Sequence, residues 1–250
     1  MQVVLLAAGM GKRLAPYTET LPKCLLKVAE ESLLERHLRT YQHAGIDHIT
    51  IVTGHQSEML RKAVLELPFA RPIDWVFNPD YRHGSLLSLK SALGALRDDD
   101  LIFMDADVYY GPGLFMRLRD SSYPNCALVD TRSSETGEEM MIGVSKGRAI
   151  AIARRLDPSQ SYDLIGESVG FFKVCRHDVP LLRTVIDDTE VGFGKDSEYE
   201  AAINRFFQVV HVGVERADDF SWTEIDFEED LTRAREVIAP ALEKEAACAD

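Results

Sequence analysis

The feature that most constrains the fold is a regular alternation of strand-like and helix-like segments through the first half of the chain. Short apolar or β-branched runs predict strands at 3–7, 48–53, 74–77 and 101–104. Apolar residues at helical spacing predict helices at 32–44, 57–67 and 86–96. Ser57 and Ser85 are the expected N-caps of the last two helices. This order is typical of a parallel sheet with right-handed crossovers, whose ligands bind at the carboxyl ends of the strands.

The second half of the chain is less regular and predicts a mixed β region. Strands are expected at 126–130, 140–145, 149–154, 168–174 and 209–214. Helices are expected at 177–186, 198–207 and 228–238, followed by a frayed tail at 243–250. No internal repeat or long linker interrupts the chain. We therefore expect a single domain over 1–240, with halves at 1–125 and 126–240 and a tail at 241–250.

Composition excludes several classes of function. The net charge of −13 argues against a nucleic-acid surface, which needs a basic face. No apolar stretch is long enough to span a membrane, and the first residues lack a secretory pattern. The four cysteines are scattered without the spacing of a zinc or redox site, which indicates reduced thiols in a cytoplasmic protein. A homodimer is compatible with the sequence, but no segment marks an interface.

A glycine turn with nearby positive charge follows the first predicted strand. Gly9 and Gly11 precede Lys12 and Arg13, and Lys23 follows soon after, in a chain that is acidic overall. Small residues let backbone N–H groups approach phosphate oxygens, and the cations supply charge. The turn lacks the third glycine of the Rossmann fingerprint and the Ser or Thr of a Walker A loop. The remaining alternative to phosphate binding is an ordinary turn with solvated cations.

The pattern around this turn resembles the signature of the nucleotidyltransferase (NTP-transferase) family. It runs Leu6-Ala7-Ala8-Gly9-x-Gly11-x-Arg13-Leu14, then Pro16-x-Thr18, then Pro22-Lys23-x-Leu25. Lys12 departs from the Thr or Ser that is usual in the family. The resemblance implies a Rossmann-like α/β fold with a mostly parallel central sheet, flanking helices and a small mixed β extension. It also implies a nucleotide-binding first half and an acceptor-binding second half. It makes Lys23 and Arg13 catalytic residues that stabilise the phosphates.

Two pairs of carboxylates are candidates for a metal site. Asp105 and Asp107 follow the strand at 101–104, and Glu224 and Asp226 repeat the i, i+2 spacing late in the chain. Nucleotidyl transfer needs a divalent cation, and Mg²⁺ takes oxygen ligands. The resemblance assigns Asp107 and Asp226 as the Mg²⁺ ligands, with Asp105 and Glu224 in support or in a partial second metal site. The alternative is that these aspartates cap turns.

Several segments are similar to the cytidylyltransferase branch of the family, which uses CTP. They are Asp105-Ala106-Asp107, Trp222 to Leu231 (WTEIDFEEDL), Asn78-Pro79 and His83-Gly84-Ser85-Leu86. The resemblance implies nucleotide contacts from Leu6, Ala7, Ala8, Gly9, Gly11, Lys12, Arg13, Lys23, Gly54, Asn78, Gly84, Ser85 and Asp105. The expected reaction transfers CMP from CTP to a phosphorylated or phosphonate small molecule, phosphocholine-like by preference, and releases pyrophosphate. Alternatives are a sugar-1-phosphate nucleotidylyltransferase using UTP, dTTP or GTP, and a nucleotide-binding regulatory protein without catalysis.

The acceptor is expected to bind between the Asp-rich turn and the later β region. The predicted substrate contacts are Tyr109, Glu167, Phe171, Trp222 and Glu224, and Tyr110, Tyr199 and Phe220 are further candidates for the lining. Aromatic faces beside a carboxylate would suit a quaternary or primary ammonium group through cation–π and Coulomb attraction. The alternative is that Phe171 and Trp222 pack in the core.

Overall fold

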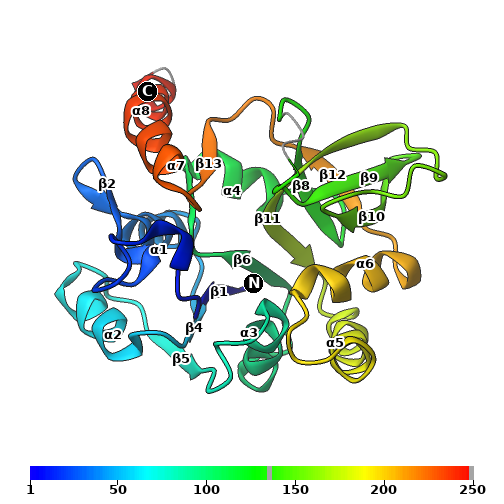
Figure 1. Cartoon of the computed structure of the whole chain (residues 1–250), viewed down its shortest axis with the longest axis horizontal. Helices are drawn as coiled ribbons and strands as arrows, with labels where there is room; N and C mark the ends of the chain where they lie inside the picture. Colours follow the sequence, from blue (N-terminus) through cyan, green and yellow to red (C-terminus); the bar gives the residue numbers. More distant parts are fainter. Residues whose placement is uncertain (134–136, 248–250) are drawn as a thin grey trace.

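The computed structural model describes residues 1–133 and 137–247. Its centre is a nine-stranded sheet with the order β5-β4-β1-β6-β11-β8-β12-β10-β9 (Figure 1). β9 also pairs with β11, so the strands beyond β6 close on themselves. The strands of the sheet are β1 (Gln2–Ala7), β4 (His48–Thr53), β5 (Ile73–Phe77), β6 (Leu101–Asp105), β8 (Cys126–Asp130), β9 (Met141–Ser145), β10 (Arg148–Ala153), β11 (Leu164–Val174) and β12 (Gly213–Arg216).

The first part of the sheet is parallel and buried on both faces. β1 pairs in parallel with β4 and β6, and β4 pairs in parallel with β5. Val3 and Leu5 pack in the core that contains residues of α1, α2 and α4, whereas Val4 packs with residues of α3, α5 and α6. The helices are α1 (Leu33–His43), α2 (Ser57–Glu66), α3 (Ser85–Ala92), α4 (Pro112–Arg119), α5 (Val179–Phe193), α6 (Tyr199–Val209), α7 (Glu228–Arg233) and α8 (Ala239–Ala247). The predicted Rossmann-like sheet with flanking helices and a mixed extension is confirmed.

The two predicted N-caps are wrong, although both helices form. Gln56 precedes α2 with a left-handed φ of 50°, and the Ser57 hydroxyl instead lies 2.9 Å from the hydroxyl of Thr53. Gly84 precedes α3, and the Ser85 hydroxyl accepts a hydrogen bond of 2.9 Å from the backbone N–H of Tyr199. Both hydroxyls therefore tie their helix to another segment.

The second half differs more from the sequence-based expectation. The strand predicted at 209–214 begins only at Gly213, because α6 continues to Val209. The tail predicted to fray from residue 243 is helical through Ala247, and residues 248–250 lie outside the described part. α7 and α8 are joined by a π-helical segment, Ala234–Ile238. The sequence analysis did not predict α4, the ribbon of β2 (Lys27–Val28) and β3 (Glu31–Ser32), or the ribbon of β7 (Val108–Tyr110) and β13 (Trp222–Glu224).

The β7–β13 ribbon brings residues 222–226 to the carboxyl edge of the parallel strands. Glu224 pairs with Val108, and the backbone N–H of Ile225 donates a 3.1 Å hydrogen bond to the carbonyl of Asp107. Leu6, at the end of β1, is in register with Asp105. The glycine turn and both carboxylate pairs therefore meet at one edge of the sheet. Among the described residues, no helix combines the length and apolar character that a membrane span requires.

Candidate active site

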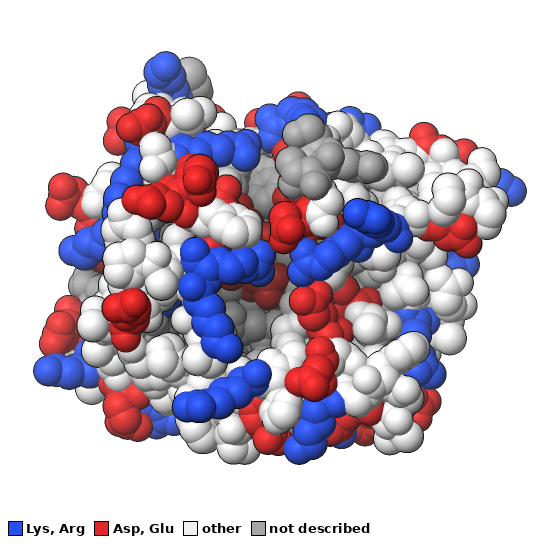
Figure 2. Space-filling model, viewed as in Figure 1, with Lys and Arg blue, Asp and Glu red and all other residues white. Residues whose placement is uncertain are grey.

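The carboxyl edge of the parallel strands opens into a cleft of about 420 Å³. The loop after β1 forms one wall, the turn after β6 forms the floor, and the start of α6 lies opposite. Figure 2 shows basic and acidic side chains gathered around the central hollow. The predicted nucleotide, metal and acceptor residues that line it are Leu6, Ala7, Ala8, Gly9, Gly11, Lys12, Arg13, Lys23, Ser85, Asp105, Asp107, Tyr199, Glu224 and Asp226.

The N-terminal wall carries the positive charge. Gly11 has a φ of +60°, and a Cβ there would lie 3.0 Å from the Thr18 methyl group, so its conformation and packing both require glycine. Beside Gly9, by contrast, a Cβ would meet no protein atom within 4 Å, so this side of the loop is free for a ligand. Arg13 lies half exposed at the mouth, where its guanidinium is 3.0 Å from Asp226. This wall can therefore present backbone and a bidentate cation to a polyphosphate.

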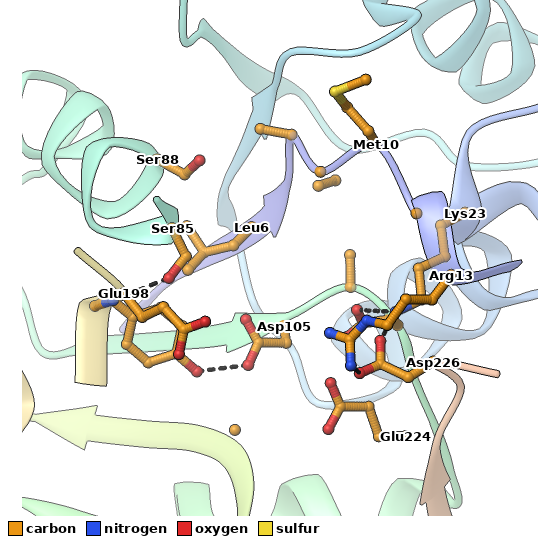
Figure 3. A pocket seen from close by; sticks show the side chains of 18 of the residues that line it. Leu6, Met10, Arg13, Lys23, Ser85, Ser88, Asp105, Glu198, Glu224 and Asp226 are labelled. Atoms are coloured by element: carbon orange, nitrogen blue, oxygen red, sulfur yellow. Dashed lines mark hydrogen bonds and ion pairs between the residues drawn. The ribbon is translucent and has the colours of Figure 1, made fainter. Parts of the chain in front are cut away.

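Lys23 connects this wall to the carboxylates. Its ammonium lies 2.6 Å from Asp107 and 2.5 Å from Asp226 (Figure 3). Burial alone would lower the pKa of Lys23, but attraction to Asp107 and Asp226 outweighs that effect and raises the pKa above its usual value. Lys23 is therefore a permanent cation that neutralises charge between two residues far apart in the sequence.

Asp107, Glu224 and Asp226 form a carboxylate cluster. One oxygen of each lies within 4.8 Å of the others. Asp107 Oδ1 is buried and has no hydrogen-bond partner among the described residues. Desolvation and repulsion by Asp107 and Asp226 raise the pKa of Glu224 to about 8, so the cluster is short of positive charge even with Lys23 present. Three hard oxygen donors and an orphaned carboxylate oxygen fit a divalent cation such as Mg²⁺.

Asp105 is separate from this cluster. Its carboxylate accepts a 2.5 Å hydrogen bond from the hydroxyl of Tyr199. Figure 3 shows Asp105 set apart from Lys23 and Asp226. Gly170 packs against it with a φ of +77°, and a Cβ at Gly170 would lie 2.4 Å from Asp105 Oδ2. Burial and repulsion by Asp107 raise the pKa of Asp105 well above its usual value. Asp105 is thus hydrogen-bonded to Tyr199 and lies outside the three-carboxylate cluster, and its support of the metal site stays a prediction.

Three predicted nucleotide contacts do not line the cleft and have structural roles. A Cβ at Gly54 would lie 2.3 Å from Tyr81, so this glycine lets the Tyr81 side chain pack against the end of β4. The buried Asn78 donates to the hydroxyl of Ser88. A Cβ at Gly84 would lie 2.0 Å from the carbonyl oxygen of Ser197, where two loops cross. Each residue shapes the rim without facing the hollow.

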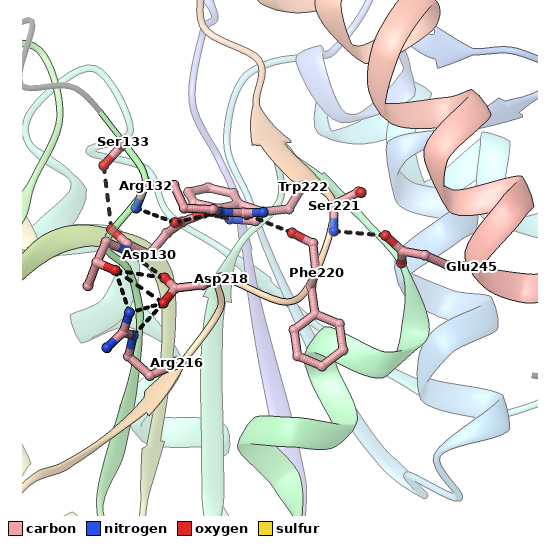
Figure 4. Close-up of polar contacts among 10 residues, drawn as sticks. Asp130, Arg132, Ser133, Arg216, Asp218, Phe220, Ser221, Trp222 and Glu245 are labelled. Atoms are coloured by element: carbon pink, nitrogen blue, oxygen red, sulfur yellow. Dashed lines mark hydrogen bonds and ion pairs between the residues drawn. The ribbon is translucent and has the colours of Figure 1, made fainter. Parts of the chain in front are cut away.

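The predicted aromatic acceptor contacts pack in the core instead. Tyr109 and Phe171 are 1% and 0% exposed, because β7 and β11 direct them into the packed interior. Trp222 is also buried, and its indole N–H donates to Asp130, as Figure 4 shows. Glu167 does not line the cleft either; burial raises its pKa to about 7. Of the further candidates, Tyr110 and Phe220 are likewise absent from the lining.

Other lining residues were missed by the sequence analysis. They include Met10, Cys24, Tyr81, Arg82, Ser88, Glu138, Met140, Arg154, Ser168, Gly170, Glu198 and Glu200. Arg154 directly follows β10 and pairs with Glu198 at 3.3 Å, and Glu198 immediately precedes α6. No local motif marks such residues, because they converge only when β10, β11 and α6 pack together. The one sequence signal for this wall of the cleft was the helical pattern at 198–207, which placed Tyr199 and Glu200 in the first turn of a helix.

The glycine loop, the bridging lysine and the clustered carboxylates in this cleft are the arrangement expected of a nucleotidyltransferase. A family model described as "MobA-like NTP transferase domain" matches residues 3–168. The chain belongs to this family.

Curated relatives agree with this class. A bifunctional IPC transferase and DIPP synthase of Rubrobacter xylanophilus is 28% identical over 93% of this chain. The chain spans about half (51%) of the length of that relative. A CTP:phosphoglutamine cytidylyltransferase of Campylobacter jejuni is 20% identical over 92% of this chain and 98% of its own length. The solved structure of a CTP:phosphocholine cytidylyltransferase from Streptococcus pneumoniae superposes with a TM-score of 0.72 at 22% identity, covering 94% of this chain and 98% of that one.

Proposed function

We propose that the protein transfers CMP from CTP to a phosphate or phosphonate oxygen of a small acceptor and releases pyrophosphate. The observation that carries the proposal is the convergence of Lys23, Asp107 and Asp226 beside the glycine loop. Cytidylyltransferases among the relatives, with the segments 105–107 and 222–231, support CTP as the donor. The free thiols of Cys24, Cys126 and Cys175 support a reducing, cytoplasmic location. A sedimentation measurement of the molecular mass would test the homodimer that the sequence allows.

The geometry supports catalysis by positioning and electrostatics. Asp107 and Asp226, with Glu224 beside them, would hold Mg²⁺. When bound, the metal ion neutralises negative charge on the phosphates. The ammonium of Lys23 lies next to these carboxylates and is placed to stabilise charge on the α-phosphate. Arg13 and the backbone of the glycine loop are placed to hold the β- and γ-phosphates.

The acceptor oxygen attacks the α-phosphorus in line, and pyrophosphate leaves on the opposite side. The bond between the α-phosphorus and the oxygen that links it to the β-phosphorus breaks as the new P–O bond forms, and that oxygen leaves with pyrophosphate. The acceptor phosphate is already a nucleophile at neutral pH, so the protein needs no covalent intermediate. Its contribution is to align the two substrates and to offset their mutual repulsion.

A pyrophosphate-release assay tests the proposal. It compares CTP with UTP, dTTP, GTP and ATP, with and without EDTA, over acceptors that include phosphocholine, phosphoethanolamine, aminoethylphosphonate, inositol phosphate, glycerol phosphate and sugar-1-phosphates. We expect release with CTP that stops when the divalent cation is removed. Faster release with UTP, dTTP or GTP and a sugar-1-phosphate would assign the other branch of the family. Nucleotide binding without release for any acceptor would indicate a regulatory protein.

A further inference from the structure

The wall of the cleft opposite the N-terminal loop is acidic. Glu198 and Glu200 lie at the start of α6, Glu138 precedes β9, and Asp105 lies at the end of β6. Arg154 approaches Glu198 at 3.3 Å and Glu138 at 3.9 Å, and Arg13 of the facing loop approaches Glu138 at 3.6 Å, so these two cations offset part of this charge. The remaining carboxylates face the hollow on the side away from Lys23.

Glu200 is less fully compensated, because Arg154 attracts it without forming an ion pair among the described residues, and burial raises the pKa of Glu200 to about 7. The Glu200 side chain is among those that line the cleft, and its buried Oε2 atom has no hydrogen-bond partner among the described residues. Asp105, the next carboxylate on this wall, receives its hydrogen bond from the neutral hydroxyl of Tyr199. Within the described part of the chain, neither residue forms an ion pair. A buried carboxylate oxygen without a partner is costly, and a ligand that donates to it would remove that cost.

Aromatic faces are scarce in the same region. Tyr81, His83 and Tyr199 carry the aromatic rings among the described lining residues, and the His83 imidazole lies 2.9 Å from Asp196. Tyr199 is 2% exposed, and its ring meets Phe103 and Phe172 edge-on at 5.8 Å and 6.1 Å. The guanidinium of Arg82 already lies over the ring of Tyr81, 5.5 Å from its centre. The cleft therefore lacks the open aromatic cage that holds a quaternary ammonium.

We propose that the acceptor carries an ammonium group with N–H bonds and that Glu200 receives it, with Asp105 beside it. The inference rests on the proposed function, and it names the class of acceptor. A primary ammonium supplies both the positive charge and the donor that Glu200 Oε2 lacks. A trimethylammonium group has no N–H, and a neutral polyol leaves the charge of the wall uncompensated. The aromatic contacts expected from the sequence for an ammonium group, Phe171, Tyr109 and Trp222, pack in the core.

Three acceptors of similar size test the inference in the pyrophosphate-release assay with CTP: phosphoethanolamine, phosphocholine and n-propyl phosphate. We expect kcat/KM to be at least about tenfold higher for phosphoethanolamine than for either of the others. Glu200→Gln keeps the shape but removes the charge, and should lower kcat/KM for phosphoethanolamine about 30-fold, mainly through KM, since the ammonium then meets a neutral acceptor in place of a carboxylate. The same variant should change the value for n-propyl phosphate less than threefold.

Glu58→Gln is the matched control, because Glu58 is exposed on α2 away from the cleft. It should leave all three values unchanged, and thermal melting should show that both variants are folded. If phosphocholine or n-propyl phosphate equals phosphoethanolamine in the wild type, the ammonium assignment is wrong while the proposed function stands. An unchanged preference in Glu200→Gln removes Glu200 from the assignment. No release with CTP and any acceptor overturns the proposed function and this inference together.

Discussion

The two walls of the cleft differ both in charge and in the way the chain builds them. The N-terminal wall comes from one continuous segment, residues 6–23, and carries Lys12, Arg13 and Lys23. The opposite wall is assembled from the ends of β6 and β10, part of β11 and the start of α6, and its carboxylates outnumber its cations. A triphosphate has the same shape in every nucleotide, so one local motif can bind it. An acceptor varies, and its contacts are spread over elements that meet only in the fold.

The floor of the cleft, which carries Asp107, lies between the two walls, and transfer between the substrates is expected to depend on it. Asp107→Ala should reduce pyrophosphate release by about 10³-fold, because the carboxylate cluster loses a ligand and Lys23 loses a partner. The assay is release from CTP at saturating Mg²⁺. Asp98→Ala, at an exposed aspartate of the 98–100 run, is the control and should keep wild-type turnover. Turnover above a tenth of wild type in Asp107→Ala would remove this residue from the metal site.

Lys23 connects the N-terminal wall to the floor of the cleft. Its replacement should therefore have two effects, one on turnover and one on stability. Lys23→Met should lower turnover about 10²-fold, since an interaction with the α-phosphate is lost. It should also lower Tm without metal, because Asp107 and Asp226 lose the cation between them. Added Mg²⁺ should then raise Tm more than in the wild type, as measured by thermal melting.

The exposed Lys62→Met is the matched control for Lys23→Met. We expect it to show wild-type turnover and the wild-type response to Mg²⁺. If Mg²⁺ raises Tm equally in wild type and in Lys23→Met, then the Lys23 ammonium does not compete with Mg²⁺ for Asp107 and Asp226.

Substitution of Trp222 tests whether the acceptor is bound only by residues that line the cleft. Trp222→Phe removes the hydrogen bond to Asp130 and should cost about 1 kcal/mol of the free energy of unfolding. Because the indole faces the core, the KM for the acceptor should stay within about twofold of wild type. Chemical denaturation and acceptor titrations measure the two quantities. A large rise in KM with little loss of stability would return Trp222 to the acceptor site.

The smallest expected effect concerns Glu167, which lies on β11 and is absent from the cleft lining. Its pKa is raised from 4.5 to about 7, first by burial. When the pKa of a carboxyl group is higher in the folded state than in the unfolded state, the group stabilises the fold fully below about pH 4.5. This stabilisation is lost as the pH rises through about 7. Glu167→Gln cannot ionise, so it should have a higher Tm than wild type at pH 8 and the same Tm near pH 4. A Tm difference that does not vary with pH would contradict this assignment, and Glu58→Gln again serves as the control.

Local signals in the sequence were enough for the parallel half of the fold and for the N-terminal wall. The strand at 48–53 matches β4, and the glycine pattern placed Gly11, Arg13 and Lys23 at the cleft. The aromatic contacts failed for a different reason. Alternation along β11 shows that Phe171 and Phe172 face opposite sides, but both sides of this strand are packed, and Phe172 is only 2% exposed.

The rest of the site depends on packing that no local pattern encodes. The Tyr199 hydroxyl reaches Asp105 across 94 positions of sequence, and Ser85 accepts from the backbone of Tyr199 across 114. The Ser85 hydroxyl was expected to cap its own helix, yet it serves another segment. Contacts of this kind follow from how α3, α6 and β6 are stacked, so they are visible only in the folded chain.

The β7–β13 ribbon has a consequence for the synthesis of the protein. Lys23 and Asp226 are 203 positions apart, and they meet only once β13 has paired with β7. A nascent chain that has emerged as far as β6 contains the glycine loop and the parallel strands β1, β4 and β5, but its carboxylate cluster is incomplete. Residues up to Asp226 must leave the ribosome before this cluster can assemble. If the proposed function holds, a product truncated before β13 would keep the glycine loop but lack the cluster needed for transfer.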